Sequence, residues 1–333
     1  NTYEQIEKDG FIIDEKIENL LSSDTKRSVA KSTGLATILL SDAFYRLDPD
    51  TVLLLGDRSE THAAATTAML MNIHIAHIHG GEITEGAIDE KIRHSITKMS
   101  SLHFTSTDEY RNRVIQMGEN PNSVFCVGAP GIDNIINTSL LSKCDLESEL
   151  CWKINGVTAL FTFHPETLST IDIKKEIKRI LKVIKSVGIN VLFTYANSDN
   201  GGMIINNEIE KFVYKDKNKY LVIKNLGQLK YLSAMKHLDF VIGNTSSGII
   251  EAASFHKPVV NIGSRQSGRL QSGNVIDTSI EKLEDSIDKA TSASFVKYCR
   301  NVENIYGDGN ASGQIVTILE NNDPNIVKKF IDL

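Results

Sequence analysis

The sequence predicts an α/β protein in which two doubly wound domains face each other across a cleft. Short apolar runs alternate with stretches whose apolar residues recur at helical spacing, and this alternation occurs in two sets. Between the sets, the polar residues 138–155 lack apolar periodicity and are expected to hold the interdomain connection. The length of 333 residues also suits about two domains of common size.

The first set predicts an N-terminal domain over residues 1–150. It opens with a helix over 27–47, and the continuous apolar run 51–55 follows as a strand that parallel neighbours bury on both faces. The remaining strands of this domain are expected at 74–78, 102–105 and 123–127, and its remaining helices at 59–71, 89–100 and 108–118.

The second set predicts a C-terminal domain over residues 151–314. Its short apolar runs predict strands at 158–163, 190–194, 220–223, 238–242 and 258–261. The stretches between them predict helices at about 172–187, 203–214, 226–236 and 247–256. Residues 315–333 are expected to hold one or two closing helices.

The composition narrows the class of protein. The 36 Lys and Arg against 42 Asp and Glu give a net charge of −6, which argues against a nucleic-acid partner but allows a small basic pocket. No apolar run approaches the ~20 residues that a membrane-spanning helix needs, and the polar residues 1–20 carry no secretory signal. The four scattered cysteines argue against a disulfide scaffold or a zinc ribbon. We therefore expect a cytoplasmic enzyme.

Polar residues gather at the ends of the predicted strands, where ligands bind in open parallel sheets. The segments concerned are 56–58, 79–82, 128–131, 164–166 and 243–248. Two domains that face each other would bring all of these ends to one interdomain cleft.

One of these segments has the features of a phosphate site. Gly243-Asn244-Thr245-Ser246-Ser247-Gly248 follows a strand and opens a helix. Small residues let a phosphate approach the backbone, where hydroxyls and free amides bind it. Glu251, on the same helix, suits the two hydroxyls of a ribose. The alternatives are a tight turn with a Ser/Thr N-cap and, for Glu251, a solvated helix residue.

The loop over residues 263–269 places two arginines among glycines, just past the next strand. The guanidinium groups of Arg265 and Arg269 suit a diphosphate. The alternative is a solvent loop with two surface charges. The position of this loop opposite the Ser-rich turn favours phosphate binding.

The densest group of ionisable residues lies between 77 and 94. Its members are His77, His79, Glu82, Asp89, Arg93 and His94. Strand alternation puts His77 and His79 on one face, as a metal site would require. No complete set of metal ligands with an established spacing emerges, so general acid/base chemistry is the favoured interpretation and no metal is expected. Arg93 and His94 are alternatively a helix-face pair.

Two more candidates end apolar strands. Asp57 is a partly desolvated carboxylate that suits a general base, or alternatively caps the following helix. His164 can donate to a phosphate or to a leaving oxygen, or is alternatively a packed, hydrogen-bonded histidine.

Six short motifs occur in order along essentially the whole chain. They are GDR at 56–58, AHIHGGE at 76–82, IDEKIRH at 88–94, FHPET at 163–167, GNTSSG at 243–248 and YGDGN at 306–310. Together they resemble the UDP-N-acetylglucosamine 2-epimerases, most closely the hydrolysing branch that feeds sialic acid synthesis.

The resemblance implies a GT-B-like fold, with two Rossmann-type domains around a cleft and a last helix that crosses back to the first domain. It implies UDP-N-acetylglucosamine (UDP-GlcNAc) as substrate, and UDP and free N-acetylmannosamine as products. Removal of the C2 proton and anti elimination of UDP would give a 2-acetamidoglucal, to which water adds with inversion at C2. No cofactor is expected, because this chemistry requires neither a nicotinamide nor a metal.

The resemblance also implies roles for individual residues. Asp57, Glu82 and Asp89 match acidic positions on the sugar side, and Arg93 supports them. His164 lies near the diphosphate, Thr245 and Ser246 supply phosphate-binding hydroxyls, Glu251 holds the ribose, and Arg265 belongs to the nucleotide site. Some relatives place Glu where this chain has His79, so His79, Glu82 and Asp89 stay open as alternatives for the base.

Several questions remain open from the sequence. The family implies a first strand unit with a basic-acidic turn before this chain begins, and we expect the first sheet to lack that strand. The alternative activities are the same chemistry on UDP-2,4-diacetamido-2,4,6-trideoxyglucose, a GT-B glycosyltransferase, a non-hydrolysing epimerase and a UDP-sugar binder. A homodimer or homotetramer is expected, without a membrane partner.

Overall fold

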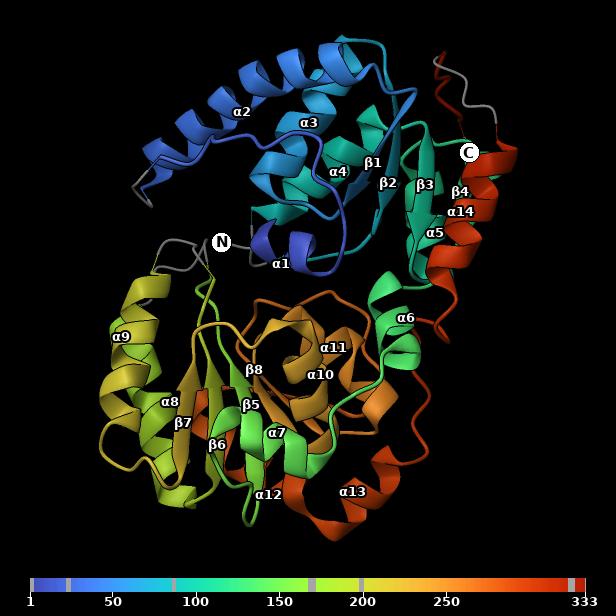
Figure 1. The fold of residues 1–333 in the computed structure, drawn as a ribbon. Coiled ribbons are helices and arrows are strands. Elements are labelled where there is room, and N and C mark those ends of the chain that lie inside the picture. Colours follow the sequence, from blue (N-terminus) through green and yellow to red (C-terminus); the bar gives the residue numbers. More distant parts are fainter. Residues whose placement is uncertain are drawn as a thin grey trace.

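The chain forms two lobes, and each lobe is built around a parallel β-sheet flanked by helices (Figure 1). The computed structural model describes residues 3–21, 25–85, 88–166, 172–197, 201–322 and 327–332. The two sheets confirm the predicted α/β class and its organisation into two Rossmann-like units.

The first sheet has the strand order β1-β2-β3-β4. Its strands are β1 (Thr51–Leu55), β2 (His74–Ile78), β3 (Leu102–Thr105) and β4 (Val124–Cys126). The helices of this lobe are α1 (Tyr3–Lys8), α2 (Lys26–Leu47), α3 (Ser59–Leu70), α4 (Asp89–Met99) and α5 (Asp108–Gln116), and a 3₁₀ turn, η1 (Pro121–Ser123), precedes β4.

The prediction that β1 is buried on both faces is wrong. The side chains of Leu53 and Leu55 are 46% and 58% exposed. Leu53 and Leu55 alternate along the strand and so lie on one face of the sheet, which the described residues leave partly uncovered. An apolar run alone does not show whether both faces of its strand are covered.

The second sheet has the strand order β10-β9-β8-β5-β6-β7. Its strands are β5 (Thr158–Thr162), β6 (Asn190–Thr194), β7 (Tyr220–Ile223), β8 (Phe240–Gly243), β9 (Val259–Ile262) and β10 (Val275–Thr278). The order reverses between β5 and β8, and the carboxyl ends of strands at such a reversal form the usual ligand crevice.

The helices of the second lobe cover both faces of its sheet (Figure 1). They are α7 (Lys143–Leu150), α8 (Ile173–Val187), α9 (Gly202–Val213), α10 (Gly227–His237), α11 (Ser246–Ile250), α12 (Leu283–Thr291) and α13 (Ala293–Cys299), with the 3₁₀ helices η2 (Ala252–Phe255) and η3 (Ile280–Lys282). One core of apolar residues lies between the sheet, α8, α9 and α12, and another lies between the sheet, α7 and α10.

Three elements of this lobe differ from the predictions. Residues 138–155 contain the helix α7, whose Leu146 and Leu150 are buried one turn apart against the sheet. The predicted helix 247–256 is broken into α11 and η2 near Glu251. The strand β10 was missed because its sequence, Val-Ile-Asp-Thr, is short and half polar.

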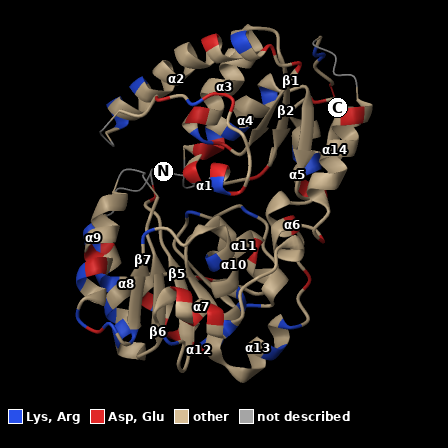
Figure 2. Cartoon of the chain, viewed as in Figure 1, with Lys and Arg blue, Asp and Glu red and all other residues tan. Residues whose placement is uncertain are grey.

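Two helices connect the lobes. The helix α6 (Pro130–Asn137) contributes to an apolar cluster at the junction, together with Tyr110 of the first lobe and Leu232 and Ile249 of the second. The last described helix, α14 (Ala311–Asn321), packs Ile315, with Ile318 and Leu319, against the first sheet. No helix of the described residues is long and apolar enough to cross a membrane. Figure 2 shows acidic and basic residues in both lobes.

The start of α14 is held by a carboxylate from α6. Both oxygens of Asp133 accept hydrogen bonds from the backbone amides of Ala311 (2.9 Å) and Ser312 (2.6 Å). We expect Asp133→Ala to lower the free energy of unfolding by about 0.5–2 kcal/mol, as the loss of a helix cap does. Urea unfolding monitored by circular dichroism measures the change, and Asp308→Ala, at an exposed neighbouring position, is the matched control.

Candidate functional site

An ionised network forms around Arg93 where β1 and β2 end. This fully buried arginine of α4 forms a short ion pair with Asp57, in the turn after β1. It also donates to Oε2 of Glu90 (3.1 Å), to Oγ1 of Thr84 (2.9 Å) and to the carbonyl oxygen of Glu82 (2.9 Å). The arginine therefore ties the turn after β1 to the loop after β2.

Glu90 is a member of this network that the sequence analysis missed. Its Oε2 also accepts from the amide of Thr84 (2.6 Å), and its Oε1 pairs with Nε2 of His94 (3.0 Å). The signal was present, because Glu90 lies three and four residues before Arg93 and His94 on one helix. Asp89, the predicted acidic residue, is partly buried in the first turn of α4.

His79 and Glu82 form the second pair of the cluster. Nδ1 of His79 lies 2.6 Å from Oε1 of Glu82, which also accepts from the hydroxyl of Ser106 (3.0 Å). Burial raises the pKa of the Glu82 carboxyl, but the charge of Arg269 and the hydrogen bond from His79 outweigh burial and hold that pKa well below its usual range. Because an ionised carboxylate only accepts, Nδ1 of His79 carries the proton and Nε2 is left as the basic atom.

The prediction that His77 and His79 share a face is wrong. β2 ends at Ile78, and His79 adopts a left-handed backbone with φ of 68°, so strand alternation stops before it. His77 is instead a buried structural residue that contacts the carbonyl oxygen of Gly56 (2.9 Å) and the hydroxyl of Thr97 (3.3 Å). Burial lowers the pKa of His77 to about 4, which keeps the ring neutral.

His164 lies at the reversal of strand order in the second sheet, directly beyond β5. The side chain of Asn244 holds its backbone on both sides, accepting from the amide of His164 (2.7 Å) and donating to its carbonyl oxygen (2.8 Å). Nδ1 of His164 accepts from the amide of Asn197 (3.1 Å), so Nε2 is the protonated atom. Burial, with Arg265 and Arg58 nearby, lowers the pKa of His164 to about 3, so the ring is a neutral donor at neutral pH.

The Ser-rich turn follows β8 on the other side of the same reversal. Thr245 caps α11 by accepting from the amide of Ser247 (3.4 Å), and Ser246 and Gly248 lie in the first turn. The hydroxyl of Ser247 donates to Glu251 (2.5 Å). The predicted N-cap is thus present. The hydroxyl proton of Ser247 is already used in the hydrogen bond to Glu251. Thr167, the last residue of the predicted FHPET motif, lies outside the described residues.

Glu251 lies where α11 meets α6. A Cβ atom on Gly131 would come within 3.2 Å of its Oε1, so the glycine leaves room for the carboxyl group. Burial raises the pKa of Glu251 to about 7, although the Ser247 hydroxyl acts in the opposite direction. Ligand hydroxyls that donate hydrogen bonds to the ionised carboxylate of Glu251 would stabilise the ionised form against the effect of burial.

The sequence predicts that Glu251 holds the ribose hydroxyls of UDP, and on that prediction Glu251→Gln should weaken UDP binding by about 1–3 kcal/mol, because an amide cannot form charge-assisted hydrogen bonds with those hydroxyls. Wild-type affinity for UDP should also fall as the pH drops below about 7, since protonated Glu251 must then release its proton on binding. Isothermal titration of both proteins at about pH 6 and at about pH 8, roughly one unit below and above the pKa of Glu251, measures both effects. Equal affinities across the range would contradict the role.

The same shift has the opposite effect on the free protein. A carboxyl group whose pKa is raised from 4.5 to about 7 on folding contributes stability that is present at low pH and is lost as the pH rises to about 7. Glu251→Gln should therefore melt at a higher temperature than the wild type above neutral pH while binding UDP more weakly.

The loop over residues 263–269 closes this side of the site. Glu166 accepts from the amides of Ser264 (2.8 Å) and Arg265 (3.0 Å), and Arg265 donates to the carbonyl oxygen of Asn244 (3.2 Å). Gln266, which is buried, donates to the same oxygen (2.8 Å). Neither Glu166 nor Gln266 was predicted to have a role. Arg265 therefore lies close to His164, and its charge contributes to the lowered pKa of that histidine.

Arg269 is placed differently from the prediction of an open diphosphate ligand. Its Nη1 forms an ion pair with Oε2 of Glu82 (2.7 Å), across the junction between the lobes. The sequence analysis could not foresee this pair, because its partners lie far apart in the chain.

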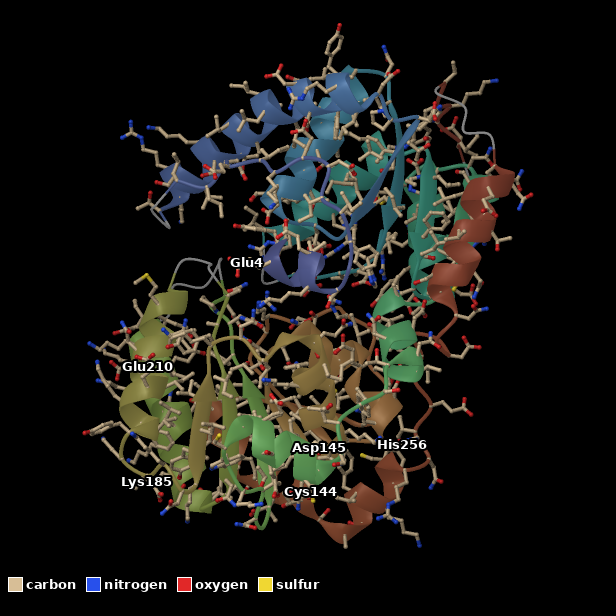
Figure 3. All side chains as sticks on the ribbon, in the orientation of Figure 1. Glu4, Cys144, Asp145, Lys185, Glu210 and His256 are labelled. Carbon is tan, nitrogen blue, oxygen red and sulfur yellow. The ribbon has the colours of Figure 1, made fainter. Side chains whose placement is uncertain are left out.

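Other features of the described residues give no further site for this chemistry. They contain no group of three or more His, Cys, Asp or Glu side chains that could hold a metal ion. The four cysteines are unpaired. A hollow of about 610 Å³ lined by Asp108, Cys126 and His256 lies elsewhere on the junction. It reaches Gly128 of the predicted strand-end segment 128–131 but includes none of the residues predicted to act in catalysis or in UDP binding. Figure 3 labels His256 on the side of the lower lobe away from α9.

Comparison with known proteins identifies the family. The sequence profile of the UDP-N-acetylglucosamine 2-epimerases matches residues 1–320. The chain belongs to this family. The predicted resemblance is confirmed, and the protein is an enzyme of the UDP-sugar 2-epimerase kind.

The relatives of this 2-epimerase differ in their substrates. It is 44% identical, over 88% of the chain and 77% of the relative, to the GDP/UDP-N,N'-diacetylbacillosamine 2-epimerase (hydrolyzing) of Campylobacter jejuni. It is 36% identical to the polysialic acid biosynthesis protein P7 of Escherichia coli, over 96% of the chain and 82% of the relative.

The fold is also that of the solved 2-epimerases. The UDP-GlcNAc 2-epimerase of Neisseria meningitidis, solved with UDP-GlcNAc, superposes with a TM-score of 0.77 at 20% identity, covering 91% of this chain and 84% of that one. This likeness confirms the GT-B-like arrangement that the sequence predicted.

Proposed function

We propose that the protein is a hydrolysing UDP-sugar 2-epimerase that acts on UDP-N,N'-diacetylbacillosamine, the 2,4-diacetamido sugar, with UDP-GlcNAc as the second candidate substrate. The 44% identity to the Campylobacter jejuni enzyme supports the first sugar. The likeness to the Neisseria meningitidis enzyme bound to UDP-GlcNAc favours keeping the second.

The observation that carries the proposal is the meeting of two groups at one interdomain junction. Asp57, Arg93, His79 and Glu82 supply proton-transfer chemistry from the first lobe. His164 and Arg265 supply a neutral donor and a cation from the second. Elimination of UDP from a sugar needs both, because a proton leaves C2 while negative charge grows on the diphosphate.

In the proposed first step, Nε2 of His79 takes the C2 proton as the C1–O bond to UDP breaks. The electron pair of the C2–H bond forms the C1=C2 double bond, and the pair of the C1–O bond leaves with UDP. Nε2–H of His164, the guanidinium of Arg265 and the hydroxyls of Thr245 and Ser246 stabilise the charge on the departing diphosphate. Glu82 fits an orienting role better than that of the base, because its oxygens are already bonded to His79, Ser106 and Arg269.

In the proposed second step, water adds across the double bond of the glycal. Its hydroxyl group bonds to C1, and its remaining proton passes through the carboxylate of Asp57 to C2, on the face opposite to the one that lost its proton. His79 releases the proton that it took in the first step to the solvent. Inversion therefore needs two proton-transfer groups, and Asp57, which reaches the cluster from a separate turn, is our second candidate. The products are UDP and the free 2-epimeric sugar.

The substrate is tested by incubating the protein separately with UDP-N,N'-diacetylbacillosamine and UDP-GlcNAc. We expect release of UDP and a free 2-epimeric sugar, with a larger kcat/KM for the diacetamido sugar. A larger kcat/KM for UDP-GlcNAc would reverse the assignment of substrate. Turnover that requires an added acceptor would instead identify a glycosyltransferase.

The resemblance to the family also leads us to propose a homodimer or homotetramer located in the cytoplasm. The Escherichia coli relative, named for polysialic acid biosynthesis, supports a role in making capsule sugars of the sialic or legionaminic acid type. Light scattering on the purified protein measures the oligomeric state directly.

A further inference from the structure

The guanidinium of Arg269 connects the two lobes. Arg269 lies in the loop between β9 and β10 of the second lobe. Its Nη1 pairs with Oε2 of Glu82 at 2.7 Å, and its Nη2 donates to Oγ1 of Thr84 at 3.2 Å. The side chains of Arg269 and Glu82 are only 7% and 3% exposed, so solvent screens this pair little.

The loop that carries Arg269 also carries the nucleotide-side arginine. Glu166 fixes the backbone at Arg265, and the guanidinium of Arg265 contacts the segment that holds His164. Three residues separate Arg265 from Arg269 in the chain. A displacement of one is therefore transmitted to the other through a short, hydrogen-bonded stretch of backbone.

The contact between this loop and the first lobe is close. A Cβ atom on Gly268, which has φ of 80°, would collide with the side chain of Ile83. The amide of Leu270 donates to the hydroxyl of Tyr110 (2.9 Å), and the hydroxyl of Tyr306 donates to the carbonyl oxygen of Leu270 (2.7 Å). These contacts hold the loop against the first lobe on both sides of Arg269.

Thr84 joins the pair to the rest of the acid/base cluster. Its Oγ1 accepts from both Arg269 and Arg93, and Arg93 pairs with Asp57. Glu82, held by Arg269, contacts His79 with its other oxygen. A continuous chain of polar contacts thus runs from the nucleotide loop to the proton-transfer groups.

We propose that Arg269 is a positioning residue that couples nucleotide binding at residues 263–269 to the orientation and protonation of the Glu82–His79 pair. The inference rests on the proposed function for its consequence in turnover, but the coupling itself exists without turnover. UDP that binds beside Arg265 and His164 shifts the loop over residues 263–269, and Arg269 moves with the loop. Because Arg269 pairs with Glu82, the Glu82 carboxylate moves too and reorients the ring of His79. Without Arg269, the Glu82 carboxylate loses the ion pair that fixes its second oxygen, so it can turn away from His79.

The test uses ¹⁵N-histidine NMR on the ligand-free protein and on the protein saturated with UDP. The signals of His79 are assigned by their loss in His79→Asn. In the wild type, we expect the Nδ1-protonated tautomer and a change of the His79 signals on addition of UDP. In Arg269→Met, the change on addition of UDP should be lost, while Arg269→Lys, which retains the charge, should keep part of it.

The matched control is Arg179→Met, which removes an exposed arginine that pairs with Glu281 in the same lobe. It should behave as the wild type. If Arg269→Met fails to fold, Arg269→Gln provides the same test, because it removes the charge that pairs with Glu82 and keeps a polar side chain. A response of His79 to UDP that is unchanged in the folded Arg269→Met or Arg269→Gln protein overturns the inference, as does its absence in the wild type.

Turnover separates the inference from the proposed function. With an active wild type, we expect kcat of Arg269→Met to fall about 10²-fold, the loss typical of a misplaced catalytic group. Its KM and its affinity for UDP should change little, because Arg265 and His164 keep their contacts. A kcat that does not fall, or a loss that appears in KM instead, contradicts the positioning role. A wild type that couples UDP to His79 but converts neither sugar refutes the proposed function and leaves the coupling intact.

Discussion

His79→Asn should reduce kcat by about 10²–10⁴-fold while UDP still binds, because it removes the only basic atom that the Glu82 pair leaves for the substrate. Asn tolerates the left-handed backbone of His79, so the replacement avoids strain at this position. Steady-state kinetics of UDP release, together with titration of UDP, separates the loss of proton transfer from a loss of binding.

The chain offers a closely matched control for this variant. His256 also has a left-handed backbone, with φ of 54°, and is exposed in the second lobe. His256→Asn should leave kcat and KM unchanged. Full activity of His79→Asn would exclude His79 as a proton-transfer group and return Asp89, the other open candidate, to consideration.

We expect Asp57→Asn to reduce kcat by a factor similar to that expected for His79→Asn. The Asn side chain still offers Arg93 a hydrogen-bond acceptor, so the buried guanidinium is not left without a partner. What disappears is the carboxylate, and with it a group that can carry a proton to or from C2. UDP binding should survive, because the nucleotide side of the site belongs to the second lobe.

Thermal unfolding and UDP titration of Asp57→Asn reveal whether the effect is chemical. The control is Asp172→Asn, at the N-cap of α8, where Asn caps as well as Asp. A lower melting temperature together with lost UDP affinity would show that Asp57 supports the structure of the cleft rather than the reaction.

Most of the sheet architecture follows from local patterns in the sequence. Runs such as Thr158–Thr162 are buried along their whole length, and a continuous apolar run reports such burial directly. The helix α7 was not predicted, although Ser142 caps it and Leu146 and Leu150 recur at helical spacing, because only two apolar residues carry its pattern. The exposed face of β1 could not be predicted, since it depends on which segments pack against that face of the sheet.

The site was predictable to the extent that the strand ends define it. His164 and Asn244 meet because β5 and β8 are neighbours, and the turn chemistry of each was readable from the sequence. The Arg269–Glu82 pair depends on how two lobes meet, which no local pattern encodes. The separation of His77 from His79 depends on a single left-handed residue, which overrides strand periodicity.

The most direct test of the account is proton NMR of the reaction in D₂O with UDP-N,N'-diacetylbacillosamine and, in parallel, UDP-GlcNAc. Removal of the C2 proton, elimination and hydration predict UDP and a free 2-epimeric sugar that carries deuterium at C2. A UDP-linked 2-epimer would instead identify the non-hydrolysing reaction. A free sugar that keeps its C2 proton, or retains its configuration at C2, would contradict the elimination mechanism and the roles assigned to His79 and Asp57.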